Sequence, residues 1–176
     1  MSSLYLAFQL SNEDKAKLIP NYEYLKNNAE GDFVDPSTFH ITCNFLSKEQ
    51  IEVNKAIEAL RLFDKKYSVN KIKLSAKDFC QFEQGVMWMG LHDSFPLYVI
   101  KKKIEECLLE VGFPLQEDKF DGYTPHITMG YNVNTFSTLN RQFPNIDLTI
   151  DNLTLWGSPK CNDTYITNSL YKINFK

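Results

Sequence analysis

The chain contains one short phrase twice: DPSTFHITCNF at residues 35–45 and DGYTPHITMGY at residues 121–131. Asp, Thr, His, Ile and Thr recur at the same places in both copies, and each copy ends in an aromatic residue. The shared histidines are His40 and His126, and the whole sequence has only 3 histidines. A repeat of this kind inside one small protein indicates an internal duplication in which the two histidines have a common task.

The segments around the two copies follow a common order. Apolar runs at residues 4–10 and 86–92 predict buried strands, and each run precedes a segment with helix signals. Each copy of the phrase then predicts a further strand, followed by a helix or loop and another strand. The sequence therefore predicts one α+β domain over residues 1–176, with pseudo-twofold halves at approximately 1–82 and 83–176.

Local signals place the ends of the predicted elements. Ser11 can cap the first helix, and Pro20 is expected to end or kink it. In the second half Gly112 supplies the stop of a helix with apolar residues at helical spacing: Leu97, Ile100, Ile104, Cys107, Leu108 and Val111. The other predicted elements are a helix at 47–63 with a Ser47/Gln50 capping box, a short helix or loop at 134–142, and strands at 71–79, 146–156 and 169–175.

The repeated phrase is apolar, β-branched and aromatic, which is typical of a strand. Residues i and i+2 of a strand point to the same face. The pattern therefore predicts that His40 and Thr42 project together, as do His126 and Thr128, with Gly130 leaving room beside the second pair. The opposite, core-facing set is then Ile41, Cys43 and Phe45 in the first copy and Ile127, Met129 and Tyr131 in the second.

Two His-Thr pairs that face one another suit a tetrahedral phosphate. An imidazole can take or give a proton near neutral pH, and a threonine hydroxyl can donate a hydrogen bond to a phosphate oxygen. With one histidine as base and the other as acid, the arrangement predicts a phosphodiesterase that needs no metal and no other cofactor. His40, Thr42, His126 and Thr128 are the predicted catalytic residues.

Other interpretations of these residues stay open at this stage. The duplicated phrase can be inert structure, or His40, His126 and His92 can hold zinc, although the close ligand spacing and paired cysteines of most zinc sites are absent. His92, before Asp93, is expected at the surface or at a helix entry. Asp35 and Asp121 are expected to brace the turns before their strands.

Composition limits the class of partner. The net charge is −3 and the sequence pI is about 5.6, which disfavours a protein that coats long nucleic acid. The expected partner is a small nucleotide or short oligonucleotide. No apolar run is long enough to cross a bilayer, no signal peptide is visible, and the 4 cysteines form no CxxC. We therefore expect a cytoplasmic protein with reduced thiols, and leave its oligomeric state open.

The chain resembles the 2H phosphoesterase superfamily, of the LigT-like or 2′-5′ RNA ligase type. The resemblance rests on HITCNFL and PHITMGY, on GFPLQEDKFDGYTPHIT before the second motif, and on the closing LTIDNLTLWGSPKCNDTYITNSLYKINF. It implies a bilobal fold in which two small antiparallel sheets flank a central cleft, with helices outside. It also implies His40/Thr42 and His126/Thr128 as the catalytic set, working without metal.

Known members of this superfamily suggest a range of substrates. Many bacterial RNA 2′,3′-cyclic phosphodiesterases carry an arginine shortly after the second motif, where this chain has Met129, Gly130 and Tyr131. Other members cleave 2′-5′ oligoadenylates, ADP-ribose cyclic phosphate or cyclic nucleotide messengers of antiviral defence. A viral or phage counter-defence enzyme, active in immune evasion, is thus among the expectations. The alternatives are a non-catalytic nucleotide sponge or sensor using the same cleft, and a ligase.

Nucleobases stack on aromatic side chains, and the chain is rich in aromatics. The candidates for base stacking are Phe8, Tyr131, Trp156 and Tyr165. Lys160, before the final hairpin, is a candidate for a phosphate contact, with a solvated surface position as the alternative.

Overall fold

The computed structural model describes residues 3–47, 52–115, 122–135, 139, 143–158, 160, 161, 164, 165 and 168–176. Its helices are α1 (Asn12–Asn27), α2 (Val53–Lys66) and α3 (Phe95–Glu110), with a short 3₁₀ helix, η1, at Pro36–Thr38. Its strands are β1 (Ser3–Gln9), β2 (Ala29–Phe33), β3 (His40–Ser47), β4 (Ile72–Gln81), β5 (Met87–His92), β6 (His126–Thr135), β7 (Ile146–Ile150), β8 (Asn152–Ser158), β9 (Lys160–Cys161), β10 (Thr164–Tyr165) and β11 (Asn168–Asn174).

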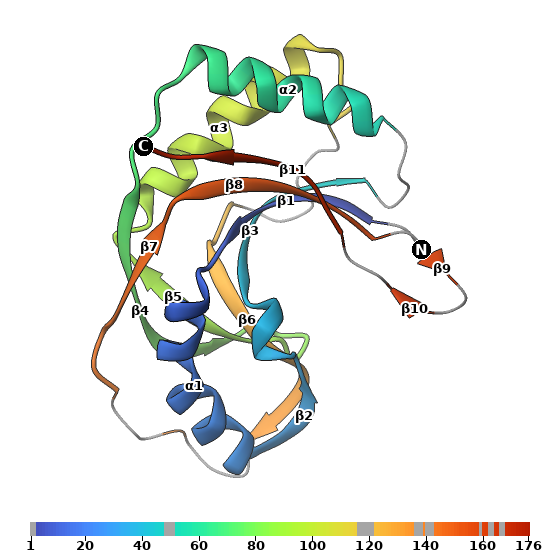
Figure 1. The fold of residues 1–176 in the computed structure, drawn as a ribbon. Coiled ribbons are helices and arrows are strands. Elements are labelled where there is room, and N and C mark those ends of the chain that lie inside the picture. Colours follow the sequence, from blue (N-terminus) through green and yellow to red (C-terminus); the bar gives the residue numbers. More distant parts are fainter. Residues whose placement is uncertain are drawn as a thin grey trace.

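The main sheet is antiparallel and curled, with the strand order β11-β8-β1-β3-β6-β5-β4-β7 and with β2 beside β6 (Figure 1). β9 and β10 form a separate pair. At the centre, β3 and β6 are matched by one residue pair, Ile41 with Ile127. The predicted α+β, bilobal fold is confirmed, and the two small sheets expected from the resemblance are joined edge to edge through this pair.

Each lobe takes strands from both halves of the sequence. We call β1, β3, β8 and β11 the first lobe, and β4, β5, β6 and β7 with β2 the second lobe. β4 pairs with β5 and β7, whereas β8 pairs with β1. The helices likewise pack across the two halves of the sequence: α1 contacts β7, whereas α3 lies against β3 and α2 (Figure 1). The lobes therefore do not coincide with the sequence halves 1–82 and 83–176.

Both predicted helix signals beside the repeated phrase are present. The Ser11 side chain accepts a hydrogen bond from the Asp14 backbone N–H at 3.1 Å and so caps α1. Gly112 has a φ of +70°, a left-handed conformation that ends α3 at low cost. Pro20 does not end α1, which continues to Asn27. Buried side chains on both sides of the proline, among them Leu18 and Leu25, hold the helix against the sheet.

Three predicted boundaries need correction. α2 begins at Val53, because Ser47 is the last residue of β3; Gln50 lies outside the described residues. Residues 146–156 form two strands that part at Asp151, since β7 joins the second lobe and β8 the first. In 134–142, the first two residues end β6, and the structure describes only residue 139 of the rest.

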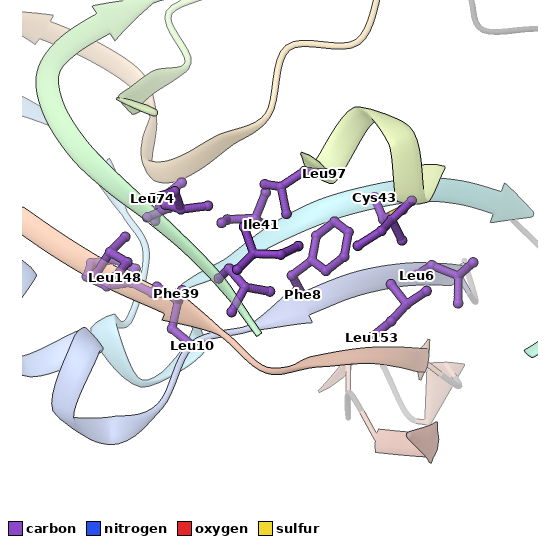
Figure 2. Close-up of a cluster of buried hydrophobic side chains, with 14 of the residues drawn as sticks. Leu6, Phe8, Leu10, Phe39, Ile41, Cys43, Leu74, Leu97, Leu148 and Leu153 are labelled. Atoms are coloured by element: carbon purple, nitrogen blue, oxygen red, sulfur yellow. The ribbon is translucent and has the colours of Figure 1, made fainter. Parts of the chain in front are cut away.

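Buried apolar side chains form one cluster that extends through both lobes. Figure 2 shows Phe8 at its centre, surrounded by Ile41, Cys43 and Leu97. Phe8 has no exposed surface, so it lies in the core and cannot contact a ligand. The prediction that Phe8 stacks on a base is therefore wrong: Phe8 pairs with Ile41, on the buried face of the sheet. Among the described side chains the free cysteines are Cys43, Cys80 and Cys107.

Each copy of the repeated phrase carries a β-bulge at the same place. Against β1, Thr42 pairs with Ala7 and Asn44 with Leu6, so Cys43 is the extra residue. Against β5, Thr128 pairs with Trp88 and Gly130 with Met87, so Met129 is the extra residue. One extra residue reverses the alternation of faces beyond it. The aromatics that close the phrases, Phe45 and Tyr131, are accordingly 53% and 50% exposed instead of buried in the core.

The bulges also correct the prediction for Gly130. It lies on the buried face, where an added Cβ would meet the Val133 Cγ2 at 3.0 Å and the Asp32 carbonyl oxygen at 3.2 Å. Gly130 therefore allows close packing of β6 against β2 and does not provide space beside the second His-Thr pair.

Candidate active site

The two His-Thr pairs lie on adjacent strands and on the same face of the sheet. Ile41 and Ile127, which pair between β3 and β6, are fully buried on the opposite face. His40, Thr42, His126 and Thr128 alternate with them and are all partly exposed. Continued antiparallel register places His40 across from Thr128 and Thr42 across from His126. The four predicted catalytic residues are thus brought together by position.

Both imidazoles are held in the same way. The His40 Nδ1 lies 2.8 Å from the carbonyl oxygen of Thr38, and the His126 Nδ1 lies 2.7 Å from the carbonyl oxygen of Thr124. Because a carbonyl oxygen can only accept, Nδ1 carries the proton in each neutral ring. Nε2 is then left to accept a proton from a substrate or to return one. The Thr42 hydroxyl lies 3.3 Å from the His40 Nε2.

The turn before the first histidine is braced as expected. The Asp35 carboxylate accepts a hydrogen bond from the Ser37 backbone N–H at 2.8 Å, and the Asp35 carbonyl accepts one from the Thr38 hydroxyl at 2.6 Å. These bonds stabilise η1, and its last residue, Thr38, accepts the hydrogen bond from the His40 Nδ1. Asp121 lies outside the described residues, so its bracing role stays a prediction.

The surroundings favour the neutral form of both histidines. Burial is the main cause of the lowered pKa of His40, and the positive charges of His126 and Lys15 lower it further, against the hydrogen bond to Thr38. Burial likewise lowers the pKa of His126, against its hydrogen bond to Thr124. The effect of the His126 charge on the pKa of His40 is consistent with a shared site.

Lys15 is a functional candidate that the sequence did not single out. Its ammonium group donates a hydrogen bond to the Ser37 carbonyl oxygen at 2.6 Å, beside the turn that holds His40. Burial lowers the pKa of Lys15, whereas the charge of Asp35 raises it. The residue brings a cation from α1 to the first histidine. No sequence signal separates it from the other lysines, because its proximity depends on how α1 packs.

Aromatic side chains flank the histidines on both lobes. In the first lobe the Tyr5 ring centroid lies 5.7 Å from that of His40, and Tyr5 pairs with Phe45 on one side and Trp156 on the other. We call Tyr5, Phe45 and Trp156 the first aromatic surface. Trp156, predicted to stack on a base, is half-buried and belongs to this surface.

The second lobe carries Phe82, Trp88 and Tyr131, which we call the second aromatic surface. The ring centroids of Phe82 and Trp88 are 5.2 Å and 5.4 Å from that of His126. Tyr131, a predicted stacking residue, is exposed and follows the second bulge; its contact with a base stays a prediction. Burial and then the charge of nearby Tyr131 raise the pKa of Tyr5, consistent with the two surfaces approaching one another.

Some predicted ligand contacts lie outside what the structure describes, namely the side chains of Tyr165 and Lys160. Four aromatics of the two surfaces were not among the predicted candidates: Tyr5, Phe45, Phe82 and Trp88. A sequence signal existed for Trp88, which shares its strand face with Gly90, the residue paired with His126. Strand alternation in residues 86–92 could have placed it beside the motif.

The third histidine is apart from the pairs. His92 is exposed at the end of β5, where it pairs with Ser75, as expected for a surface residue. Within the described ranges, no group of three His, Cys, Asp or Glu side chains is arranged to hold a metal ion. No helix in the same ranges is long and apolar enough to span a membrane.

The fold is that of the LigT-like proteins. Escherichia coli LigT in complex with 3′-AMP matches with a TM-score of 0.75 and 19% identity, covering 99% of this chain and 98% of LigT; LigT structures with NADP+, ATP and phosphate also match. A protein from Thermus thermophilus matches with a TM-score of 0.72 and 16% identity, covering 98% of this chain and 97% of its own. The MHV ns2 PDE domain matches with a TM-score of 0.53 and 10% identity, covering 99% and 98%.

No family model and no curated protein sequence matches the chain. The structural matches confirm the resemblance to the LigT-like 2H phosphoesterases at the level of the fold. The two His-x-Thr motifs are features of this chain's own sequence.

Proposed function

We propose, from the LigT-like fold and its two His-Thr pairs, that the protein is a metal-independent phosphodiesterase of the 2H type. One observation carries the proposal: two His-Thr pairs with the same Nδ1 anchoring and the same bulge lie on one face of adjacent strands. A purely structural histidine would not require this repetition, whereas a reaction that both takes and gives a proton does.

The chemistry needs only these groups and the substrate. The Nε2 of one histidine takes a proton from water or from a neighbouring ribose hydroxyl, whose oxygen forms a bond to phosphorus. The bond from phosphorus to the leaving oxygen breaks, and the other histidine gives its Nε2 proton to that oxygen. The Thr42 and Thr128 hydroxyls donate to the non-bridging phosphate oxygens, on which negative charge is concentrated.

The charges fit a small anion. The chain is acidic as a whole, but Lys15 supplies a cation beside His40. A bound phosphodiester would in turn raise the pKa of a neighbouring imidazole, since an anion favours the charged form. The substrate thus helps to protonate the histidine that acts as the acid.

The substrate class that fits is a small nucleotide with a phosphodiester at a ribose 2′ or 3′ oxygen. Aromatic surfaces on both sides of the histidines can stack on bases, and LigT has been observed with 3′-AMP, ATP and NADP+. The class includes 2′,3′-cyclic phosphates, 2′-5′ oligoadenylates and cyclic nucleotide messengers. Hydrolysis of a defence messenger would silence it, which is the basis of a counter-defence role.

The test is hydrolysis of a panel of 2′,3′-cyclic, 2′-5′-linked and cyclic dinucleotides in excess EDTA. Wild-type protein and the variant His92→Ala, which removes the exposed third histidine, should both turn over at least one substrate. His126→Ala should lose that activity while staying folded by circular dichroism. Activity restored only by added zinc or manganese would contradict the metal-independent mechanism. Tight binding without turnover would instead identify a nucleotide sponge or sensor.

A further inference from the structure

The strands that carry the two His-Thr pairs share little of a hydrogen-bonded ladder. β3 and β6 are matched at Ile41 and Ile127, whereas β1 and β3 are matched along most of their length. Successive ladder bonds keep two strands at a constant spacing, so a single matched pair fixes the separation of β3 and β6 weakly. Groups outside the ladder are then needed to hold the two motifs at a set distance.

Tyr123 supplies a bond across this junction. Its hydroxyl donates a hydrogen bond to the carbonyl oxygen of Thr42 at 2.8 Å, although the two residues are 81 positions apart in the sequence. Thr42 directly precedes the bulge residue Cys43. Tyr123 in turn directly precedes Thr124, whose carbonyl oxygen lies 2.7 Å from the His126 Nδ1. One residue therefore contacts the first motif with its side chain and is joined by one peptide bond to the anchor of the second.

The first copy of the repeated phrase has a serine at the equivalent position. Ser37 and Tyr123 both lie three residues before the histidine of their copy. Ser37 is bonded locally, since its backbone N–H donates to the Asp35 carboxylate at 2.8 Å. The longer phenol of Tyr123 instead extends to β3. The second copy thus departs from the duplication at the residue that connects the two motifs.

The Tyr123 side chain is held in place from α3. The Lys101 ammonium lies 5.4 Å from the Tyr123 ring centroid, and Lys101 is 3% exposed. Lys101 pairs with Glu105, which accepts a hydrogen bond from the Asn44 side-chain amide at 2.9 Å. Thr42 and Asn44, which flank the bulge, are therefore both tied to this group. Burial is the main cause of the raised pKa of Tyr123, so its hydroxyl keeps the proton that it donates.

We propose that Tyr123 is a positioning residue that sets the distance between the two His-Thr pairs, because it holds the Thr42 carbonyl oxygen from the segment that anchors His126. The proposal rests on the phosphodiesterase function proposed above. A base and an acid that act on one phosphorus need a fixed separation, since the attacking and leaving oxygens lie on opposite sides of it. The Tyr123 hydroxyl therefore acts on turnover through Thr42 and His126 and does not add to substrate binding.

The experiment compares Tyr123→Phe with the matched control Tyr22→Phe. Each variant keeps the ring and removes one hydroxyl that donates to a backbone carbonyl oxygen, since the Tyr22 hydroxyl donates to that of Val34 at 2.7 Å. Tyr22 is 4% exposed, and its bond lies outside the two motifs. Both variants should lower the midpoint of urea unfolding to a similar extent, whereas Tyr123→Phe alone should slow turnover.

The kinetic readout is kcat and KM, measured without urea on a panel substrate that the wild-type protein cleaves. A misplacement of about 1 Å can cost on the order of 10²-fold in rate. Because the Ile41–Ile127 pairing remains, Tyr123→Phe should lower kcat by a smaller factor, about tenfold, and leave KM within about twofold of the wild-type value. Tyr22→Phe should keep both kcat and KM within about twofold.

The outcomes separate the two proposals. An unchanged kcat in Tyr123→Phe, with an active wild-type protein, overturns the positioning role and leaves the phosphodiesterase function standing. An equal fall of kcat in Tyr22→Phe also overturns the positioning role, because it indicates a general effect of a lost buried hydroxyl. A rise in KM without a fall in kcat does so too, since it indicates a substrate contact. If the wild-type protein cleaves no member of the panel, the phosphodiesterase function fails and the positioning role fails with it.

Discussion

A buried ion pair behind the first motif offers a sharp test of how the site is supported. Lys101 is 3% exposed on α3 and pairs with Glu105, which also accepts hydrogen bonds from Asn44 at 2.9 Å and from Lys102 at 3.1 Å. Asn44 follows the bulge residue Cys43. The pair therefore ties α3 to the bulge that turns Phe45 towards the histidines.

Removing either partner should be costly, because the other loses the nearest opposite charge in a largely buried pair. Breaking a buried pair typically costs about 3–5 kcal/mol. We expect Glu105→Gln to lower the free energy of unfolding by an amount near that range, because Lys101 is almost fully buried. Lys101→Met should cost less, about 2–3 kcal/mol, because Glu105 keeps its bonds to Lys102 and Asn44. The double variant Lys101→Met/Glu105→Gln should be more stable than the sum of the single losses predicts.

The assay is urea unfolding at pH 7, with Lys103→Met on the same helix as control. Lys103 lies over the Tyr67 ring at 4.6 Å, and its loss should cost within about 1 kcal/mol. Burial alone would raise the pKa of Glu105, but its hydrogen bonds to Lys101, Lys102 and Asn44 and the charge of Lys101 hold it below 4.5. The contribution of the ionised Glu105 to the free energy of unfolding is thus present above pH 4.5 and lost as the pH falls through the lowered pKa. Single variants that each cost under about 1 kcal/mol would refute this reasoning.

Two further predictions concern the core and the pH profile. Phe8→Ala should destabilise the fold by about 3–5 kcal/mol, measured by urea unfolding, because Phe8 is a core residue. The KM of the folded fraction should stay unchanged. A selective rise in KM would show a ligand contact after all. Burial lowers the pKa of both His40 and His126 below 6.5, so the bell-shaped kcat/KM profile should have its maximum below pH 6.5. Lys15→Gln removes a charge that lowers the pKa of His40 and should move one limb of the bell to higher pH; an unchanged profile would exclude this influence.

The sequence predicted the elements beside the repeated phrase because periodicity and caps are local properties. The strands at 4–10 and 86–92 and the Ser11 and Gly112 signals depend only on neighbouring residues. It did not predict the bulges, because an extra residue is defined by pairing with another strand. Simple alternation therefore placed Phe45 and Tyr131 in the core.

Two other differences arise from long-range packing. The run 146–156 looks like one strand, but its two parts pair in different lobes, and the break at Asp151 follows from the strand exchange. Phe8 and Tyr131 are both aromatic residues of strands near the motifs, and only the pairing of each strand shows which one is buried. The His-Thr pairs were placed correctly because they precede the bulge in each copy.

The most direct measurement is kcat/KM for His40→Ala, His126→Ala and the double variant on one cleaved dinucleotide. Each single variant should lose on the order of 10²–10⁴-fold, the usual contribution of general acid–base catalysis. Because the two histidines act on one phosphate, the double variant should be scarcely slower than either single variant. A folded single variant with near-normal turnover, or losses that multiply in the double variant, would contradict a shared two-histidine site.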